Sequence, residues 1–513
     1  MSTKLTYLIF CIISGFLLSL AFPGAEIWWI SFFAITPFMY IIWFSEIKSY
    51  RLIFLLSYVF FFTFFIFSLF WIRHVSIPGL LSLTLFLALL SAIVITIGKY
   101  ISVKIKIAWW IISSISWLSI EFIFSYFLGG FPWTLLGYAL APYLPLCQIA
   151  DIFGVHGISL LVIYINCAFA YVIKNYAEIE NYAFIPVGFG ITFLAITWVY
   201  GNHHLTNKIV NDPENNLRIA FIQPNIEPKI KHDSSKDRSS INKIINLSKQ
   251  AANSSPDLLI WPESAIPGYL QNYNISYYSI SNFFNKYNIP ILSGITRYYD
   301  DYSIKKRLYY NSAAVLYPPM LIKEIYDKEH LVAFGEFIPL EKYLPFLKLA
   351  TPISGSFSRG QSNTVYNFKY KDKFTAHLGI LICFEDVFPS LAIKMVKRGA
   401  NLLVNLTNDG WFGKIQPKQH SRIAMFRAIE TRTPLIRSTN TGISSVFDRT
   451  GKVIKELSKD GKNVDILGYL PVDIPLQAPA KTFYMLCKDF LAAISFFSLI
   501  ILIIPAYKKN NSY

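Results

Sequence analysis

Residues 377–389, HLGILICFEDVFP, decide the fold of the polar half of this chain. The letters GILI are apolar on both faces of a strand, which is typical of a strand buried on both sides. Pro389 suits the first turn of a helix, because its φ is already fixed and it has no N–H to leave unpaired. The stretch therefore predicts a strand that ends at Cys383, a tight turn and then a helix, as in an α/β fold.

The segment around this stretch, residues 201–480, alternates short apolar runs with amphipathic ones. Apolar runs between turn residues predict strands, and apolar residues three and four positions apart predict helices. We therefore expect an α/β layered domain. The predicted strands are residues 217–225, 257–264, 289–299, 308–319, 322–327, 379–386, 400–409 and 435–448. The predicted helices are residues 239–255, 389–399 and 417–432.

The chain as a whole is too apolar for an ordinary soluble protein. Of its 513 residues, 54% are hydrophobic, and the mean hydropathy is +0.41. A membrane-spanning helix needs about 20 predominantly apolar residues. Runs of this kind lie near residues 5–22, 25–45, 52–72, 79–98, 107–127, 155–173, 183–200 and 489–507. They predict a membrane domain of seven helices in residues 1–200, the polar domain in 201–480, and a last span with a short tail in 481–513.

The distribution of Lys and Arg predicts the orientation in the membrane. If the predicted spans alternate in direction, most basic residues of the short connections fall on one side, which is typical of the cytoplasmic side. Both termini are then cytoplasmic and the polar domain is outside, which in a bacterium is the periplasm. We expect the first run to be retained and not cleaved as a signal peptide. The formal charge of +16 is scattered along the polar domain, so no nucleic-acid partner is expected.

Cys383 is the only cysteine between residues 201 and 480, so it has no disulfide partner in that domain. A free thiol has a pKa of about 8.5 and must be activated to act as a nucleophile. The positive end of the following helix would favour the thiolate. On an extended strand His377 is about 20 Å away, whereas His330 and His420 remain open as partners. The alternative is a buried structural cysteine.

Three further polar residues directly follow predicted strands. Glu263 follows LLIWP, Lys328 follows IKEIYD and Asn408 follows LLVNLT. Ligands in open α/β folds gather at the carboxyl ends of strands, so we expect these residues near Cys383. Glu263 is suited to accept the thiol proton, and Lys328 is suited to stabilise an oxyanion. The alternatives are a loop carboxylate and a surface lysine.

Four segments resemble the carbon–nitrogen hydrolase (nitrilase) superfamily, namely LLIWPESAIPG, YDKEHLVAFGEFIPLE, GILICFEDVFP and NLTNDGWFGKIQPKQHSRIAMFRAIETRTPLIRSTNTG. Within it, the chain is similar nearly from end to end to the bacterial apolipoprotein N-acyltransferases. The resemblance implies an αββα sandwich with Glu263 as base, Lys328 as oxyanion stabiliser and Cys383 as nucleophile. Supporting or substrate-binding positions are Glu336, Phe384, Glu385, Asn408 and Trp411, with Phe384 where the family usually has tyrosine.

The resemblance further implies an inner-membrane acyltransferase. It would move the sn-1 acyl chain of a phospholipid, typically phosphatidylethanolamine, through a cysteine thioester to the α-amine of the N-terminal diacylglyceryl-cysteine of an apolipoprotein. No cofactor is expected, and the scattered histidines predict no metal site. One alternative is a membrane-tethered amidase of the same superfamily that acts on a soluble substrate. A transporter with a ligand-binding insert is another, which the small number of charges within the spans disfavours.

Two features have no assigned role at this point. Residues 335–360 are long, punctuated by Pro and Gly and rich in apolar residues, and we hypothesise that they dip toward lipid or cover the site. Leu344, Phe346 and Leu347 would make that contact. Glu121 is a carboxylate inside the fifth predicted span and is therefore a functional suspect. The alternative for Glu121 is a hydrogen bond to a neighbouring helix.

Overall fold

The computed structural model describes residues 3–175, 184–206, 216–231, 233–303, 305–338, 356–361, 364–370 and 374–510. The chain divides into two compact units. One comprises Met1–Lys208 together with Thr482–Tyr513, and the other comprises Ile209–Lys481.

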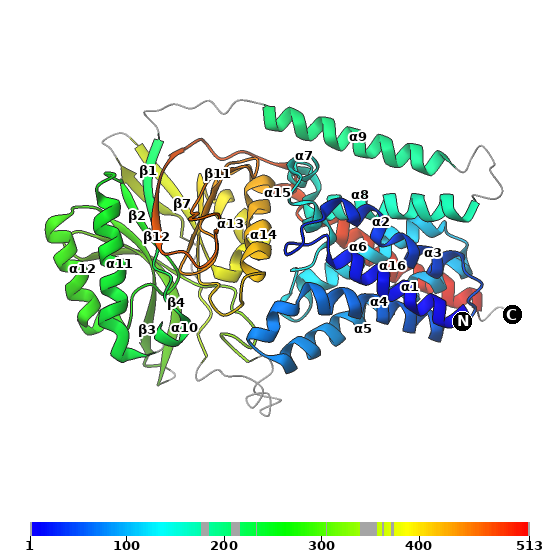
Figure 1. The fold of residues 1–513 in the computed structure, drawn as a ribbon, viewed down its shortest axis with the longest axis horizontal. Helices are drawn as coiled ribbons and strands as arrows, with labels where there is room; N and C mark the ends of the chain where they lie inside the picture. Colours follow the sequence, from blue (N-terminus) through cyan, green and yellow to red (C-terminus); the bar gives the residue numbers. More distant parts are fainter. Residues whose placement is uncertain are drawn as a thin grey trace. The chain divides into compact units, whose positions relative to one another are not determined.

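The first unit is built from helices (Figure 1). They are α1 (Thr3–Ser19), α2 (Ser31–Ala34), α3 (Thr36–Phe44), α4 (Tyr50–Ser68), α5 (Ile77–Ile105), α6 (Trp109–Tyr126), α7 (Leu144–Cys147), α8 (Ala150–Asn175), α9 (Ile185–Thr206), α15 (Phe483–Cys487) and α16 (Phe490–Asn510). Ser76 precedes α5 as its cap, and its Oγ accepts a hydrogen bond from the N–H of Gly79 at 3.0 Å. Such a cap satisfies an N–H group that the first turn leaves unpaired. At the other end Lys106 follows α5 and adopts a left-handed φ of 61°.

Within the described residues, six helices are long and apolar enough to cross a membrane, namely Tyr50–Ser68, Ile77–Ile105, Trp109–Gly129, Ala150–Asn175, Ile185–Thr206 and Phe490–Lys509. The sequence predicted eight spans. The first two predicted spans form shorter apolar helices, Thr3–Ser19 and Trp28–Phe44. The second is interrupted, because a 3₁₀ turn at Trp28–Ile30 and the short α2 precede α3. The prediction of a polytopic helical membrane protein is confirmed, although among the described residues six helices, and not eight, are long and apolar enough to span a membrane.

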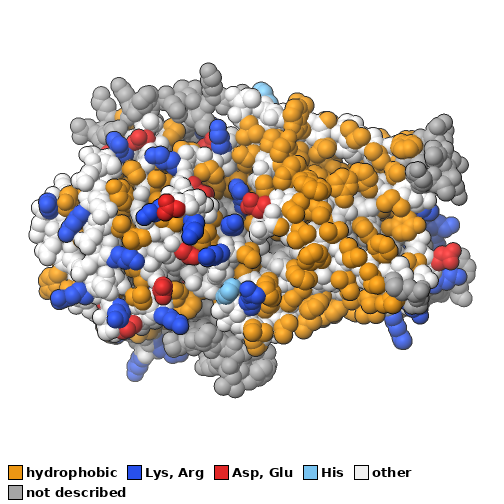
Figure 2. Space-filling model, viewed as in Figure 1, with side chains coloured by type: hydrophobic (Ala, Val, Ile, Leu, Met, Phe, Trp, Pro, Cys, Tyr) orange, Lys and Arg blue, Asp and Glu red, His pale blue; other side chains and the backbone are white. Residues whose placement is uncertain are grey.

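The surface of the helical unit matches this assignment. Hydrophobic side chains predominate on its visible face, whereas charged side chains are spread over the α/β unit (Figure 2). On α9, Phe189 and Ile191 are 64% and 61% exposed, and Ile501 on α16 is 62% exposed. Apolar side chains that point outward along a long helix are suited to lipid and not to water.

Glu121 is buried inside the helical unit and fully hydrogen-bonded. Its Oε1 accepts from the N–H of Leu136 at 2.8 Å and from Trp117 Nε1 at 3.1 Å. Its Oε2 lies 2.9 Å from Nδ1 of His156. The carboxylate therefore ties α6 to α8 and to the loop between them, which agrees with the alternative of a hydrogen bond between helices.

The second unit contains two six-stranded sheets. The first has the order β12-β1-β2-β3-β4-β5 and the second has the order β11-β10-β9-β8-β7-β6. The strands of the first sheet are β1 (Asn216–Gln223), β2 (Leu258–Trp261), β3 (Ile291–Asp301), β4 (Lys306–Tyr317), β5 (Leu321–Asp327) and β12 (Gly468–Pro475). Those of the second are β6 (Tyr366–Tyr370), β7 (Phe374–Ile382), β8 (Leu402–Thr407), β9 (Leu435–Thr439), β10 (Ser445–Phe447) and β11 (Val453–Glu456).

The two sheets pack face to face between helices, which gives four layers (Figure 1). The outer layers are formed by α11 (Asp237–Ala252) with α12 (Ile275–Lys286), and by α13 (Pro389–Lys397) with α14 (Gln416–Thr431). The short α10 (Pro228–Lys231) precedes α11. Every residue of β2, β8 and β9 is buried, as expected for strands covered on both sides. The predicted αββα sandwich is confirmed.

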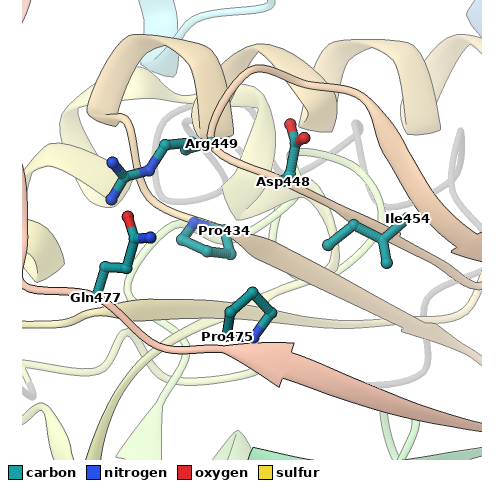
Figure 3. Close-up of a pocket in the computed structure, with 6 residues that line it drawn as sticks. All are labelled: Pro434, Asp448, Arg449, Ile454, Pro475 and Gln477. Atoms are coloured by element: carbon teal, nitrogen blue, oxygen red, sulfur yellow. The ribbon is translucent and has the colours of Figure 1, made fainter. Parts of the chain in front are cut away.

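A small cavity in the α/β unit contains none of the predicted site residues (Figure 3). It is lined by Pro434, Asp448, Arg449, Ile454, Pro475 and Gln477. The chemistry predicted from the sequence is therefore located elsewhere in this unit. Leu344, Phe346 and Leu347, on which the hypothesis for residues 335–360 depends, lie outside the described residues.

Candidate active site

Glu263 follows β2 and is held in place by the neighbouring β3. The N–H of Gly294 donates to the carbonyl of Pro262 at 3.2 Å, and the N–H of Ala265 donates to the carbonyl of Gly294 at 3.0 Å. A Cβ atom at Gly294 would come within 2.6 Å of the Cα of Glu263, so only glycine permits this close approach. The carboxylate of Glu263 accepts a hydrogen bond from Asn311 at 2.8 Å and is 9% exposed.

Lys328 follows β5 and is buried, with 1% of its surface exposed, so the alternative of a surface lysine is wrong. Its Nζ lies 2.9 Å from the carboxylate of Glu336 and 3.7 Å from Oε1 of Glu263. Burial alone would lower the pKa of Lys328, but the charges of Glu336 and Glu263 outweigh burial and the pKa is raised. Lys328 is therefore a buried cation held between two carboxylates.

Asn311 on β4 links these two carboxylates. Its Nδ2 donates to Glu263 Oε1 at 2.8 Å and to Glu336 Oε1 at 2.9 Å. Glu336 is fixed further by the N–H of Val332, which donates to its Oε2 at 2.9 Å. The sequence analysis included Asn311 in a predicted strand and assigned it no role. The available signal was an amide at the start of a buried apolar run, because a buried amide requires partners.

Cys383 lies directly after β7, at the start of the 3₁₀ turn η11 (Cys383–Val387). Its φ of 52° is in the left-handed region, which costs about 1–3 kcal/mol for a non-glycine residue and is common at active sites. Asn405 Nδ2 donates to the carbonyl of Cys383 at 2.9 Å and so holds this conformation. Cys383 is partly exposed, so the alternative of a fully buried structural cysteine is not supported.

Burial and the neighbouring charges act on the protonation of the Cys383 thiol. Burial raises the pKa of the Cys383 thiol, and the charge of Glu263 raises it further, while Lys328 opposes both. The thiol is therefore protonated at neutral pH and needs a base before it can act as a nucleophile. That the start of the following helix favours the thiolate stays a prediction.

A closed ring of four buried charged side chains supports the turn after Cys383. Nε2 of His420 lies 2.7 Å from Oδ1 of Asp386, and its Nδ1 lies 2.8 Å from Oδ1 of Asp409. The guanidinium of Arg437 donates to the remaining carboxylate oxygen of each Asp at 2.7 Å. Burial and Arg437 would lower the pKa of His420, but Asp386 and Asp409 outweigh them and raise it. The ring therefore pairs two cations with two anions.

The three histidines considered as partners of Cys383 all have other contacts. Both nitrogens of His420 are paired with carboxylates, so His420 is not a free base. The ring of His330 lies 3.8 Å from that of Phe388. His377 Nδ1 lies 2.7 Å from Oδ1 of Asn367. The sequence analysis missed the charged ring, although a charged Arg437 inside the apolar run LIRST was a signal.

Glu385 holds the start of η11. Its Oε2 accepts from the N–H of Ile382 at 2.7 Å, and its Oε1 accepts from the N–H groups of Glu329 and His330 at 2.6 and 3.0 Å. Tyr326 OH, from β5 of the other sheet, also donates to it at 3.0 Å. Burial raises the pKa of Glu385 to about 7, against the effect of these main-chain hydrogen bonds and Lys328.

The remaining predicted residues lie around the turn and the end of β8. The ring of Phe384 lies 5.3 Å from that of Phe388. Asn408 accepts hydrogen bonds from Asn440 Nδ2 at 2.9 Å and from Thr441 Oγ1 at 3.3 Å, so it orders the loops after β8 and β9. Trp411 is 46% exposed. Glu263, Lys328 and Glu336 thus contact one another, and the charges of Glu263 and Lys328 act on Cys383. The amide of Asn408 is instead bound to its own loops.

Comparison with known proteins places the two units in one family. The profile of the apolipoprotein N-acyltransferase N-terminal domain matches residues 14–168, and that of the carbon–nitrogen hydrolases matches residues 218–477. The apolipoprotein N-acyltransferase of Geobacter metallireducens is 34% identical over 460 residues, which cover 86% of this chain and 85% of that protein. The chain belongs to the apolipoprotein N-acyltransferase family.

Other members and relatives extend the comparison. The apolipoprotein N-acyltransferase of Rickettsia typhi is 30% identical over 374 residues, 72% of this chain and 70% of that protein. The solved structure of an amidase from Nesterenkonia aligns with a TM-score of 0.36 at 17% identity, over 56% of this chain and 98% of that one. The resemblance drawn from the sequence is confirmed, and the chain is an enzyme of an acyltransferase family. In the described residues no group of three or more His, Cys, Asp or Glu is arranged to hold a metal ion.

Proposed function

We propose that this chain transfers the sn-1 acyl chain of a phospholipid to the α-amine of the N-terminal diacylglyceryl-cysteine of an apolipoprotein. The observation that carries the proposal is the match to apolipoprotein N-acyltransferases across both the helical and the α/β part of the chain. The carboxylate of Glu263, the ammonium of Lys328 and the thiol of Cys383 are suitable groups for acyl transfer.

In the first step, Glu263 takes the proton of the Cys383 thiol and Sγ bonds to the carbonyl carbon of the phospholipid ester. Lys328 Nζ donates to the carbonyl oxygen as it becomes an oxyanion, and one such donor is worth about 10²–10³ in rate. The bond between the carbonyl carbon and the glycerol oxygen then breaks, and Glu263 returns the proton to that oxygen. The products are a lysophospholipid and a thioester on Cys383.

In the second step, the neutral α-amine of the acceptor attacks the thioester carbonyl. The C–N bond forms and the C–S bond breaks, and the proton from the amine passes through Glu263 to Sγ. This regenerates the thiol, so one set of residues serves both half-reactions. Glu336 holds Lys328, Glu385 holds the turn at Cys383, and Phe384 and Trp411 face the acyl chain, with Asn408 ordering the adjacent loop.

The substrates and the location follow from the same reasoning. Phosphatidylethanolamine is the proposed donor, and a diacylated lipoprotein is the proposed acceptor. The enzyme is embedded in the bacterial inner membrane with its α/β unit on the periplasmic side and both termini in the cytoplasm. Both substrates carry acyl chains, which explains why a nitrilase-like unit is joined to so many apolar helices.

The proposal is tested with purified full-length protein in detergent micelles. The donor is phosphatidylethanolamine labelled in its sn-1 chain, and the acceptor is a synthetic peptide that begins with diacylglyceryl-cysteine. We expect the label in an amide at the peptide N-terminus, and we expect the Cys383→Ala variant to produce none. Label released only as free fatty acid, or hydrolysis of small amides with the lipid untouched, contradicts the proposal and supports the amidase alternative.

A further inference from the structure

Lys231, at the end of α10, is a second amine beside Glu263. Its Nζ donates to the main-chain carbonyl of Glu263 at 2.9 Å. Lys328 approaches the same residue at its carboxylate, 3.7 Å away. Two ammonium groups from different elements therefore contact Glu263, one at its side chain and one at its main chain. The sequence analysis assigned no role to Lys231, because IEPKIKHD reads as a loop after the first strand.

The environment of Lys231 sets it apart from the other lysine of its helix. Burial lowers the pKa of Lys231 to about 8, while the negative charges of Glu263 and of ionised Cys383 act in the opposite direction. Lys229 on the same helix is exposed, as are Asp233 and Lys236 beyond the helix end. Helix α11 packs against α10 and carries a partly buried carboxyl group, Asp237. Burial and the charge of Asp233 raise the pKa of Asp237.

We propose that Lys231 is a positioning residue of the active site, which fixes the main chain of Glu263 and supplies a positive charge that stabilises the Cys383 thiolate. This inference deepens the proposed function and rests on it for its catalytic meaning. The charge matters because the thiol of Cys383 is otherwise held protonated by burial and by Glu263. A nearby positive charge lowers the pKa of an acid, and the ammonium of Lys231 is bound to Glu263, the residue whose charge acts most strongly on the thiol.

The same arrangement has a consequence for the pH dependence of Cys383. The reactive state pairs protonated Lys231 with the Cys383 thiolate. Raising the pH forms the thiolate but, above about pH 8, also removes the proton of Lys231. The population of the reactive state therefore rises with pH up to about pH 8 and then levels off. The neutral state of Lys231 with the protonated thiol holds the same number of protons, so further increase in pH brings no further gain.

The test is alkylation of Cys383 by iodoacetamide in the full-length protein, followed by peptide mass spectrometry between pH 6 and about pH 9.5. In this reaction Sγ bonds to the methylene carbon, the C–I bond breaks and iodide leaves. Exposed Cys487 in the same sample serves as the internal reference for reagent reactivity. The reaction needs no lipid, so it separates this proposal from the proposed function.

For the wild type we expect a rate that rises up to about pH 8 and then levels off. Lys231→Met removes the charge, so the rate at pH 7 falls about tenfold or more and the break disappears. Lys231→Arg keeps a charge that does not titrate in this range, so the rate stays at least at the wild-type level at pH 7 and rises without a break. Lys229→Met, the matched control on the exposed side, keeps the wild-type profile.

A break near pH 8 that persists in Lys231→Arg, or an unchanged rate at pH 7 in Lys231→Met, overturns the proposal. A wild-type profile without a break also overturns it. If the break follows Lys231 but the lipid does not acylate Cys383, the charge assignment stands and the proposed function fails. If acylation occurs and the break does not follow Lys231, the proposed function stands and this inference fails.

Discussion

At the scale of single residues, the chemistry depends on a thiol that the protein keeps protonated. Burial and the charge of Glu263 both raise the pKa of Cys383. A protonated thiol is a weak nucleophile, so its attack on an ester depends on proton transfer to a neighbouring base. Glu263 is the carboxylate whose charge acts most strongly on the thiol, and Lys328 and Asn311 hold it in place. The account therefore makes Glu263 essential for the acylation step.

We predict that Glu263→Gln lowers the rate of acylation of Cys383 by about 10²–10⁴, because an amide cannot accept the thiol proton. Single-turnover acylation by phosphatidylethanolamine, followed by intact-protein mass, measures this rate. Glu456→Gln on β11 is the matched control, since its Oε1 accepts a hydrogen bond from Asn463 that glutamine can keep. Equal rates for Glu263→Gln and the control would show that another group takes the proton.

The predicted residues share one property, which explains why they were found. Glu263, Lys328 and Cys383 each come directly after, or one residue after, a strand, and the carboxyl ends of strands are where polar side chains can face a ligand. Asn311 and Lys231 were missed because neither follows a strand directly, and their roles depend on neighbours distant in the sequence. The raised pKa of the Cys383 thiol was not predicted either, because burial around the sulfur is a property of the packed structure and not of local sequence.

At the scale of secondary structure, the turn after β7 depends on the ring of Asp386, Asp409, His420 and Arg437. These residues come from η11, the loop after β8, helix α14 and strand β9. Each charge is buried and each is paired with two opposite charges. Loss of one member leaves charges without compensation inside the protein, which costs more than the pair contributes when it is intact.

We predict that Arg437→Met destabilises the protein by about 3–5 kcal/mol, because Asp386 and Asp409 lose their common guanidinium. Thermal unfolding of the purified full-length variant measures the loss as a lower Tm. Arg307→Met is the matched control, since Arg307 forms a similar ion pair with Asp300 at 2.7 Å on an exposed part of the sheet. A Tm for Arg437→Met equal to that of the control would mean that the ring does not support the turn.

Elements that were not predicted lack the expected patterns. Helix α12 has the sequence ISYYSISNFFNK, whose aromatic and β-branched residues favour strands. It is nevertheless a helix, and Asn274 caps it by accepting from the N–H groups of Ser276 and Tyr277 at 3.1 Å. Strand β11 is largely exposed and therefore shows no apolar run. Strands β2 and β8 were predicted because they are buried along their whole length, and β1 and β7 because each contains a buried apolar run.

At the scale of the whole molecule, the chain joins an apolar helical unit to a charged α/β unit. The first predicted pair of spans differs from the expectation because an apolar run does not reveal where a helix is interrupted. The 3₁₀ turn at Trp28–Ile30 is as apolar as the helix that follows it. Hydropathy therefore predicts that a segment is in the membrane region more reliably than it predicts the length of each helix.

We predict that the α/β unit faces the periplasm. In a chain with Cys487→Ala, Lys462→Cys in an exposed turn is expected to react with a membrane-impermeant maleimide in intact spheroplasts. Lys509→Cys at the end of α16 is expected to react only after lysis, because the basic residues there favour the cytoplasmic side. Peptide mass spectrometry identifies the labelled position. Labelling of Lys509→Cys before lysis, with Lys462→Cys protected, would reverse the orientation.

The most direct test of the account is the intact mass of the full-length protein after incubation with phosphatidylethanolamine and no acceptor. The account predicts a gain of one acyl group on Cys383, which hydroxylamine removes and which the Cys383→Ala variant lacks. Addition of the diacylglyceryl-cysteine peptide should then return the protein to its original mass. A protein that gains no acyl mass, or gains it equally in Cys383→Ala, would contradict the account.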